Sequence, residues 1–261
     1  LEIIDASTRR LTPQSLEKTI IETYGLDKSR AKAVLKDLVT QGQLEYTYEF
    51  GSIYLVRSFN KPVRISDHVV IRPPGHRYQT APDDVVIQIE PGAAFGGGRH
   101  PTTRLSVNAI EYVLKTASPD WLRRRGSVLD IGTGSGILAI AAVCLGIQKG
   151  LGIDIDPCAI AEAGENIALN NLENRIVISD RKIYSIDQVF SMVIANLRFP
   201  SLKKFYPQIL DLTARGGWVV LSGYRPHEQA DLMDLYTARN FKSIWTADEN
   251  DWAAAALEKF K

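Results

Sequence analysis

The stretch "VLDIGTGSGILAIAA" (Val128–Ala142) decides the fold of this chain. An apolar run ends in Asp130 and is followed by Gly132, Gly134 and Gly136, and then by a second apolar stretch. Glycines allow a tight turn and let a ligand approach bare backbone, and the start of a helix offers free N–H groups. The stretch therefore predicts a strand, a ligand-binding turn and a helix.

The spacing of the glycines separates the classes of ligand. The dinucleotide fingerprint is GxGxxG, whereas this turn is GxGxG, and no GxxxxGK[ST] phosphate loop is present. The next apolar run ends in Asp154, 18 residues after Gly136. A carboxylate at that strand end can accept two hydrogen bonds from ribose hydroxyls, which indicates a nucleoside-containing ligand. Asp156, before Pro157, is predicted to cap a helix. Asp180, at the next strand end, fits either an adenine contact or a surface turn.

Alternating apolar runs and helical stretches predict the fold class. The runs at 85–90, 127–132, 149–156, 175–180, 191–196 and 217–223 end in Asp, Glu, Asn or Gly, and helical stretches separate the later ones. This pattern predicts an α/β fold with a Rossmann-like, doubly wound and mostly parallel sheet. Residues 241–260 predict a terminal antiparallel hairpin.

Residues 1–58 predict a separate module. Thr12 and Asp27 are predicted to cap two helices, and alternation on either side of Gly51 predicts a β-hairpin. This order is typical of a winged-helix-like α+β domain; residues 59–83 are predicted to be a linker and residues 84–261 the main domain. Residues 1–58 carry eight basic and eight acidic side chains. DNA-binding modules usually have a basic surplus, so a protein-docking or structural role is favoured over nucleic-acid binding.

The composition excludes several classes of protein. With 261 residues and a net charge of +1, bulk electrostatics gives no argument for nucleic acid or for an anionic membrane. No apolar run approaches a membrane span, and no signal peptide is recognisable. Cys144 and Cys158 form no CxxC pair and the four histidines are scattered, so we expect no metal site and a cytoplasmic protein.

Several ordered motifs together resemble one family. They are "IEPGAAFGGGRHPTTR" (89–104), "VLDIGTGSGILAIAA", "GIDIDP", "IANL", "GGWVVLSG" and the C-terminal "DW". Over residues 61–261 the chain resembles the PrmA-type ribosomal protein L11 lysine methyltransferases. The resemblance implies S-adenosylmethionine (SAM) as cofactor, with the glycine-rich loop as a mobile flap over it.

The resemblance also implies site residues. SAM-holding positions of the family correspond to Thr103, Gly132, Asp154 and Asn196. Phe95 and Gly134, from the same motifs, complete the candidate cofactor-binding set.

Asn196 is the candidate catalytic residue, because an amide at this strand end can orient the incoming amine; a structural Asn turn is the alternative. His100 is either a general base or a structural residue. Gly97 and Arg99 depart from the family loop, which has threonines there.

The favoured function is methyl transfer from SAM to a lysine or N-terminal amine of a protein substrate, with a ribosomal protein as one candidate. Two alternatives stay open: a SAM-dependent methyltransferase acting on a small molecule or nucleic acid, and a non-catalytic SAM-binding protein. Residues 1–58 differ from the family's ferredoxin-like N-terminal domain. Methyl transfer is therefore better supported than a ribosomal acceptor.

Overall fold

The computed structural model describes residues 1–5, 7, 11–49, 51–118, 121, 126–238 and 240–260. The chain forms two compact units, Leu1–Lys61 and Pro62–Lys261. Within the described part, no helix is both long and apolar enough to cross a membrane.

Unit Leu1–Lys61 contains helices followed by a hairpin. Its elements are α1 (Glu2–Asp5), α2 (Pro13–Tyr24), α3 (Lys28–Thr40), β1 (Leu44–Glu49) and β2 (Ser52–Arg57), and the two strands pair antiparallel. The Thr12 hydroxyl accepts a hydrogen bond from Ser15 N at 3.2 Å, and the Asp27 carboxylate accepts one from Arg30 N at 2.9 Å. Both predicted caps are therefore present.

A small apolar core holds this unit together. Its buried members come from both helices and both strands: Leu16, Ile20, Ala31, Leu35, Leu44 and Leu55. The spacing of these residues places one face of each helix on the hairpin, which explains the helix–helix–hairpin order. The winged-helix assignment itself stays a prediction.

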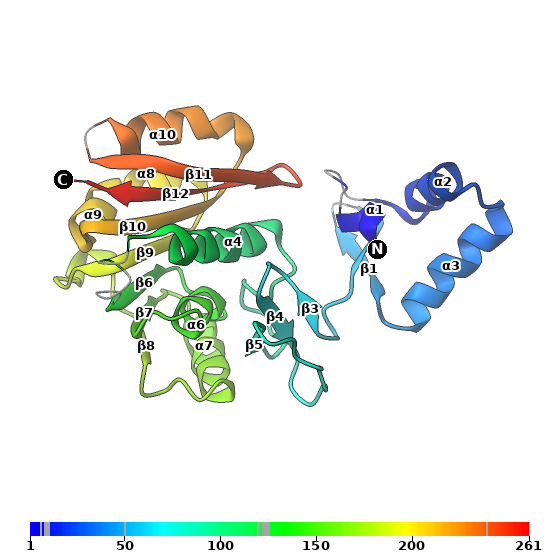
Figure 1. Ribbon diagram of the computed structural model, residues 1–261, viewed down its shortest axis with the longest axis horizontal. Coiled ribbons are helices and arrows are strands. Elements are labelled where there is room, and N and C mark those ends of the chain that lie inside the picture. Colours follow the sequence, from blue (N-terminus) through cyan, green and yellow to red (C-terminus); the bar gives the residue numbers. More distant parts are fainter. Residues whose placement is uncertain are drawn as a thin grey trace. The chain divides into compact units, whose positions relative to one another are not determined.

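Unit Pro62–Lys261 is built on a seven-stranded sheet (Figure 1). The strands are β6 (Ser127–Ile131), β7 (Lys149–Ile153), β8 (Ile176–Ser179), β9 (Phe190–Asn196), β10 (Thr213–Tyr224), β11 (Phe241–Glu249) and β12 (Trp252–Lys259). Their order is β11-β12-β10-β9-β6-β7-β8. Strands β6 to β10 pair in parallel, and β12 joins β10 and β11 antiparallel. The predicted doubly wound sheet with a terminal hairpin is confirmed.

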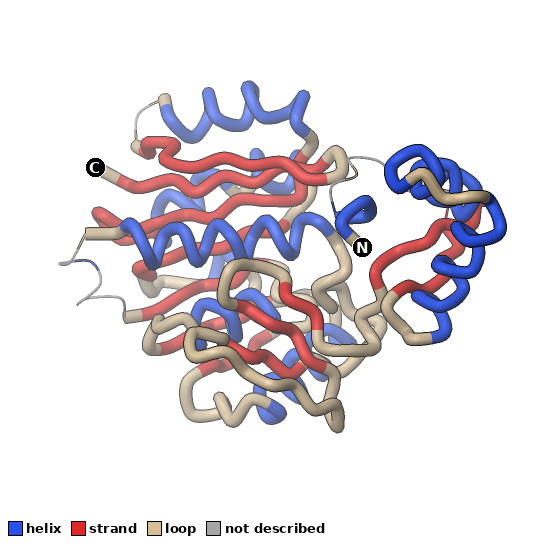
Figure 2. The backbone as a smooth tube through the Cα atoms, turned by 45° about the vertical axis from the view of Figure 1, so that its right-hand side comes forward, coloured by secondary structure: helices blue, strands red, loops and turns tan. Residues whose placement is uncertain are grey.

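Helices cover both faces of this sheet (Figure 2). One layer contains α4 (Pro101–Thr116), α6 (Ile137–Cys144) and α7 (Pro157–Leu169); the other contains α8 (Phe199–Lys204), α9 (Tyr206–Leu212) and α10 (Gln229–Thr237). Short 3-10 turns occur at Ile183–Ser185 and Pro226–Glu228. Because both faces are covered, the central strands are almost wholly buried, which accounts for their continuous apolar runs.

The segment before α4 differs from the prediction. Val85–Gln88, expected to join the main sheet, forms β5 of a separate three-stranded sheet with β3 (Val63–Arg64) and β4 (Val69–Arg72). Residues 62–83, assigned to a linker, therefore belong to the second unit. The apolar residues of β4 are buried, which requires packing that a free connection would not supply.

Charged contacts fix this segment as well. The Asp84 carboxylate accepts hydrogen bonds from Ala81 N at 2.8 Å, from Arg64 at 2.5 Å and from the Tyr78 hydroxyl at 2.8 Å. The amide of Ala81 and the Arg64 guanidinium lower the pKa of Asp84 to about 2. These contacts close the chain between β4 and β5 into a defined loop.

A buried carboxylate joins the same segment to α4. Glu111, only 4% exposed, accepts hydrogen bonds from the Ser66 hydroxyl at 2.7 Å and from His68 N at 3.0 Å. Side-chain ligand atoms of Asp67, His68 and Glu111 lie within 4.8 Å of one another, and the Lys115 ammonium lies 2.9 Å from Asp67 and 4.0 Å from Glu111. Lys115 offsets one of the two carboxylate charges, and the hydrogen bonds of Glu111 tie the segment before β4 to α4.

Leu129→Ala tests the central position of β6. Leu129 is fully buried, so its truncation should lower the free energy of unfolding by about 2–5 kcal/mol. Val177→Ala, on β8 with 61% of the residue exposed, is the control and should change stability by less than about 1 kcal/mol. Chemical denaturation measures both; equal losses would contradict the assigned core.

Candidate functional site

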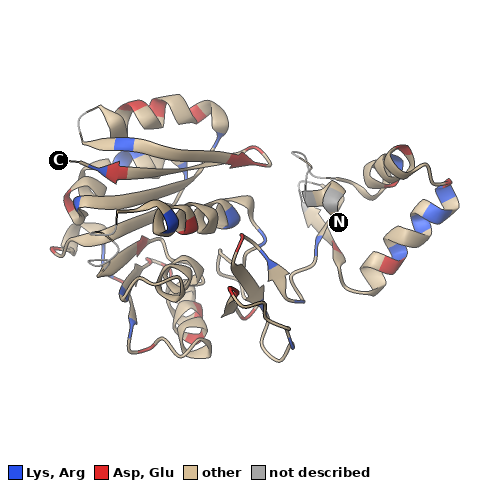
Figure 3. Cartoon of the chain, viewed as in Figure 1, with Lys and Arg blue, Asp and Glu red and all other residues tan. Residues whose placement is uncertain are grey.

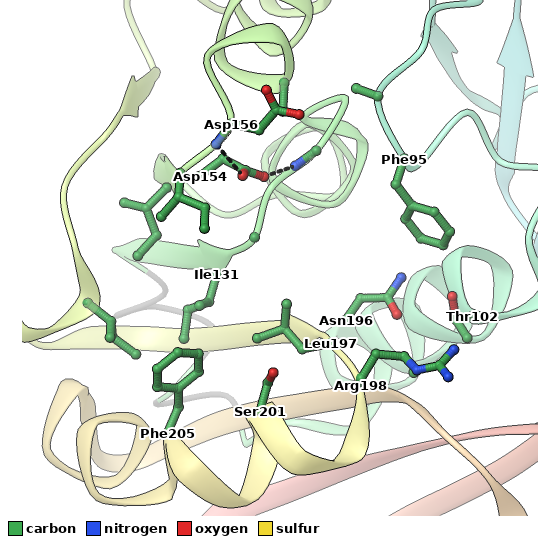
Figure 4. Close-up of a pocket in the computed structure, with 18 of the residues that line it drawn as sticks. Phe95, Thr102, Ile131, Asp154, Asp156, Asn196, Leu197, Arg198, Ser201 and Phe205 are labelled. Carbon is green, nitrogen blue, oxygen red and sulfur yellow. Dashed lines mark hydrogen bonds between the residues drawn. The ribbon is translucent and has the colours of Figure 1, made fainter.

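A cavity of about 730 Å³ opens at the carboxyl ends of β6, β7 and β9 (Figure 4). Ligands of doubly wound sheets bind at this edge. Its described lining combines backbone of the glycine turn, polar strand ends and apolar side chains, among them Ala94, Phe95, His100, Thr102, Gly132, Gly134, Asp154, Ile155, Tyr184, Asn196, Arg198 and Trp252.

The turn after β6 forms one wall of the cavity. Gly132 and Gly134 have φ of +71° and +54°, a region that residues with side chains rarely adopt. A Cβ on Gly132 would lie 2.7 Å from Leu197 Cδ2, and one on Gly134 would overlap the carbonyl oxygen of Phe95. At both positions glycine is favoured for two reasons: the backbone is left-handed, and a side chain would collide with a neighbouring residue.

Asp154 ends β7 and faces this turn. Its Oδ2 accepts a hydrogen bond from Gly134 N at 2.9 Å, and its Oδ1 accepts one from Asp156 N at 3.1 Å. Each carboxylate oxygen keeps a further lone pair for a ligand hydroxyl. Asp156 caps α7 by accepting from Cys158 N at 2.9 Å, as predicted, although it also lines the cavity.

The buried Asp130 side chain, near the end of β6, holds the glycine turn by hydrogen bonds. It is 1% exposed, and its Oδ2 accepts hydrogen bonds from the Thr133 hydroxyl at 2.7 Å and from Ala139 N at 3.2 Å. Burial raises the pKa of Asp130 to about 6, although these hydrogen bonds oppose the shift; the nearby charge of Asp154 adds to it. Asp130 thus joins β6, the turn and α6 at an electrostatic cost.

The glycine-rich loop forms the opposite wall and is anchored along its first half. Glu162 of α7 accepts hydrogen bonds from Ala93 N at 2.8 Å and Ala94 N at 2.9 Å. Ser135 donates to the carbonyl of Phe95 through its amide at 2.8 Å, and to the carbonyl of Gly96 through its hydroxyl at 2.9 Å. The contribution of Glu162 was not predicted, because it arises from a helix 69 residues further along the chain.

Arg104 anchors the second half of this loop. Its Nη1 donates to the Arg99 carbonyl at 2.6 Å and to the Gly98 carbonyl at 3.4 Å. The same guanidinium is paired with Glu249 at the end of β11, with Nε 3.0 Å from Oε1. The predicted flap is thus fixed to α7, to the glycine turn and to the β11–β12 hairpin.

Most predicted site residues line this one cavity: Phe95, Gly132, Gly134, Asp154 and Asn196. Thr103 does not line it. Thr103 is fully buried, and its hydroxyl has no hydrogen-bond partner among the described residues, whereas the neighbouring Thr102 reaches the cavity. The sequence alone does not show which of two adjacent threonines at a helix start faces the cavity, because that depends on the rotation of the helix about its axis. Asp180 is not among the described lining residues.

Asn196 and His100 differ in their availability. The side-chain amide of Asn196 has no hydrogen-bond partner within the described chain, so its oxygen and nitrogen are free to bind a ligand. His100 caps α4: its Nδ1 accepts from Thr102 N at 3.3 Å and lies 2.8 Å from the Thr102 hydroxyl. The structural interpretation of His100 is therefore the better supported one.

Sequence reasoning missed the aromatic end of the cavity. The Trp252 ring lies 4.9 Å from the His100 ring, which in turn lies 5.0 Å from the Phe95 ring. Trp252 belongs to the "DW" motif of the sequence, but only the pairing of β12 with β10 and β11 brings it beside the glycine-rich loop.

Apolar side chains remain uncovered in the cavity. Ile155 is 83% exposed, Tyr184 58% and Phe95 52%, and all three line it. Exposed apolar groups around a few fixed polar atoms are typical of a ligand pocket. The arrangement can hold a ligand with an apolar, planar part and a pair of hydroxyl groups.

Asp130→Asn tests the buried carboxyl. The carboxyl of Asp130 ionises near pH 6 in the folded chain and near pH 4 in the unfolded chain. The stability that the protonated carboxyl contributes is therefore fully present below pH 4 and is lost as the pH rises through 6. Asn keeps an acceptor without the charge. We therefore expect the stability of Asp130→Asn relative to the native protein to increase between pH 4 and pH 6, by at most about 3 kcal/mol.

Thermal unfolding across this pH range measures the difference. If the stability difference between Asp130→Asn and the native protein does not change with pH, folding does not raise the pKa of Asp130.

Comparison with known proteins places the chain in a family. The family described as "Ribosomal protein L11 methyltransferase (PrmA)" matches residues 55–259. Curated relatives with the name ribosomal protein L11 methyltransferase include those of Geotalea daltonii, 33% identical over 207 residues, and Geobacter metallireducens, 39% identical over 192 residues. These alignments cover 77% and 74% of this chain, and 65% and 60% of the relatives. The chain therefore spans less than two thirds of their length.

A solved structure shares the same architecture. The crystal structure of a ribosomal protein L11 methylase from Lactobacillus delbrueckii subsp. bulgaricus is 28% identical, with a TM-score of 0.68. It covers 77% of this chain and 100% of its own. From the matched residues, the shared fold and the relatives, this chain belongs to the ribosomal protein L11 methyltransferase (PrmA) family.

Proposed function

We propose that this protein is a SAM-dependent methyltransferase that transfers a methyl group to an amine nitrogen of a protein, either a lysine side chain or an N-terminal amine. The observation that carries the proposal is the meeting of the glycine turn, Asp154 and Asn196 in one cavity. Family membership supports methyl transfer, and the relatives' names supply a ribosomal protein as the first acceptor to test.

The cavity residues fit SAM. Asp154 has lone pairs for the two ribose hydroxyls, and the exposed Ile155 and Tyr184 offer apolar surface for an adenine ring. Gly132 and Gly134 leave the backbone of the turn uncovered for close approach. When bound, SAM supplies a methyl group on a positively charged sulfur, which is a good leaving group.

The remaining residues act on the acceptor amine. Only a neutral amine can attack, and a lysine has an ordinary pKa of about 10.4, so the site must favour the neutral form. The free amide oxygen of Asn196 can accept an N–H hydrogen bond and direct the nitrogen lone pair. With SAM bound, this hydrogen bond would orient the amine nitrogen toward the methyl carbon, and the amine would release its proton to solvent. Positioning of this kind is worth up to about 7–11 kcal/mol.

Unit Leu1–Lys61 is the proposed docking module for the acceptor. Basic residues recur along α3 (Figure 3), and Lys32 and Lys36 line a groove of about 330 Å³ with Leu35, Tyr46 and Leu55. The apolar side chains of this groove suit apolar residues of a protein segment, and its two lysines suit acidic ones. The proposed compartment is the cytoplasm, because both cysteines are free thiols.

Transfer of label tests the function. Purified protein incubated with methyl-labelled SAM and a bacterial lysate, and in parallel with purified ribosomal protein L11, should place the label on protein. Label confined to RNA or to small molecules would favour the alternative acceptors, and absence of SAM binding by calorimetry would reject the enzyme.

Gly134→Ala provides a matched pair with Gly97→Ala. The added methyl group at Gly134 overlaps the Phe95 carbonyl in a left-handed backbone, so SAM affinity should fall at least about tenfold. Gly97 has open space around it, and its backbone is not left-handed, so Gly97→Ala should bind SAM as the native protein does.

Charge reversal in the groove tests docking. Lys32→Glu with Lys36→Glu should raise the KM for the protein acceptor roughly fivefold to tenfold and leave kcat unchanged. Lys18→Glu, an exposed position on α2 outside the groove, is the control. An unchanged KM in the double variant would remove the docking role.

A further inference from the structure

One end of the cavity is cationic. The guanidinium carbon of Arg225 lies 3.8 Å from the centroid of the Trp252 ring, and that of Arg198 lies 5.2 Å from it. Arg198 lines the cavity two residues after Asn196. Figure 4 shows Arg198 beside Asn196 and Thr102, on the other side of the cavity from Asp154. The end proposed to receive the acceptor amine therefore carries positive charge.

No described carboxylate forms an ion pair with either guanidinium. The acidic groups among the described lining residues are Asp154 and Asp156, which lie with the glycine turn and α7. Glu249, on the hairpin that carries Trp252, is paired with Arg104. Within the described part of the chain, neither Arg198 nor Arg225 forms an ion pair with a side chain.

The other ionisable groups of the cavity leave the potential positive. The described lining contains the following charged or titratable side chains: His100, Asp154, Asp156, Arg181, Lys182, Tyr184, Arg198 and Lys204. The Glu228 carboxylate accepts a hydrogen bond from Arg225 N at 2.7 Å, and Arg225 Nη1 donates to the Asp251 carbonyl at 3.0 Å. Cations outnumber carboxylates on the wall.

His100 is poorly placed to accept a proton. Its Nδ1 is engaged at the start of α4, 3.3 Å from Thr102 N and 2.8 Å from the Thr102 hydroxyl. Among the described lining residues, this end provides no carboxylate as a general base, and Nδ1 of its one imidazole is already engaged. The acceptor ammonium must lose its proton by another route.

We propose that the Arg198 guanidinium, with Arg225 behind it on Trp252, favours the neutral and nucleophilic form of the acceptor amine by like-charge repulsion. The ammonium releases its proton to water as it enters the cavity, and the nitrogen lone pair is left free to attack. This role rests on the proposed function. A nearby cation changes such an equilibrium by up to about one pH unit, and the effect is smaller where water screens the charge, as at the exposed Arg198.

A binding experiment tests the charge without any acceptor. SAM carries a positive sulfonium and S-adenosylhomocysteine does not, so the same repulsion weakens SAM relative to the neutral ligand. In Arg198→Gln, the affinity ratio of SAM to S-adenosylhomocysteine should rise at least about threefold. Lys203→Gln removes a charge from the same helix outside the cavity and should leave the ratio unchanged.

The outcomes of calorimetry separate the two claims. If both ligands bind and Arg198→Gln leaves the ratio as it is in the native protein, the electrostatic role is rejected while the methyltransferase stands. If neither ligand binds the native protein, the proposed function itself fails.

The pH dependence of catalysis provides the second measurement. With ribosomal protein L11 as acceptor, the acidic limb of kcat, which reports the bound amine, should move to higher pH in Arg198→Gln by up to about one unit. Arg198→Lys, which keeps the charge, and Lys203→Gln should retain the native limb. A variant that loses activity equally at every pH would assign Arg198 a structural role and overturn the inference.

Discussion

The hydrogen bond from Gly134 N to the Asp154 carboxylate is the contact on which the rest of the site depends. It joins the turn after β6 to the end of β7, and so fixes which carboxylate lone pairs face the cavity. The bond requires Gly134 in a left-handed conformation, with the Phe95 carbonyl occupying the space of a side chain. A single backbone constraint therefore positions two strand ends and the glycine-rich loop together.

The glycine-rich loop is held from two sides, by Glu162, which is distant in the sequence, and by Arg104, which follows the loop directly. Glu162 of α7 and Arg104 of α4 bind its backbone with charge-assisted hydrogen bonds, which are stronger than neutral ones. Arg104 also binds Glu249, so the loop and the hairpin of Trp252 share one anchor. Displacing either side would alter the aromatic cluster of Phe95 and Trp252 as well, and the shape of the cavity follows from this shared support.

The sequence predicted what depends on local patterns and missed what depends on the fold. The apolar runs, the helix caps and the GxGxG turn are local, and they led to the parallel sheet, its terminal hairpin and the positions of Gly132 and Asp154. Val85–Gln88 was assigned to the wrong sheet, because a short apolar run does not state which strand it pairs with. Thr102 lines the cavity and Thr103 does not, a difference that depends on the helix phase. Trp252 and Arg198 meet only through tertiary packing, so no spacing in the sequence could reveal their contact.

The two ends of the cavity are built differently, and this has a consequence for specificity. The cofactor end consists of backbone and a carboxylate within one stretch from β6 to α7, where most substitutions would disrupt the turn. At the acceptor end, side chains come from α4, β9, the segment after β10 and β12, and Arg198 and Arg225 can change without altering that turn. Residues 1–54 lie outside the family match. Substitutions at the proposed acceptor end would therefore leave the proposed cofactor end unchanged.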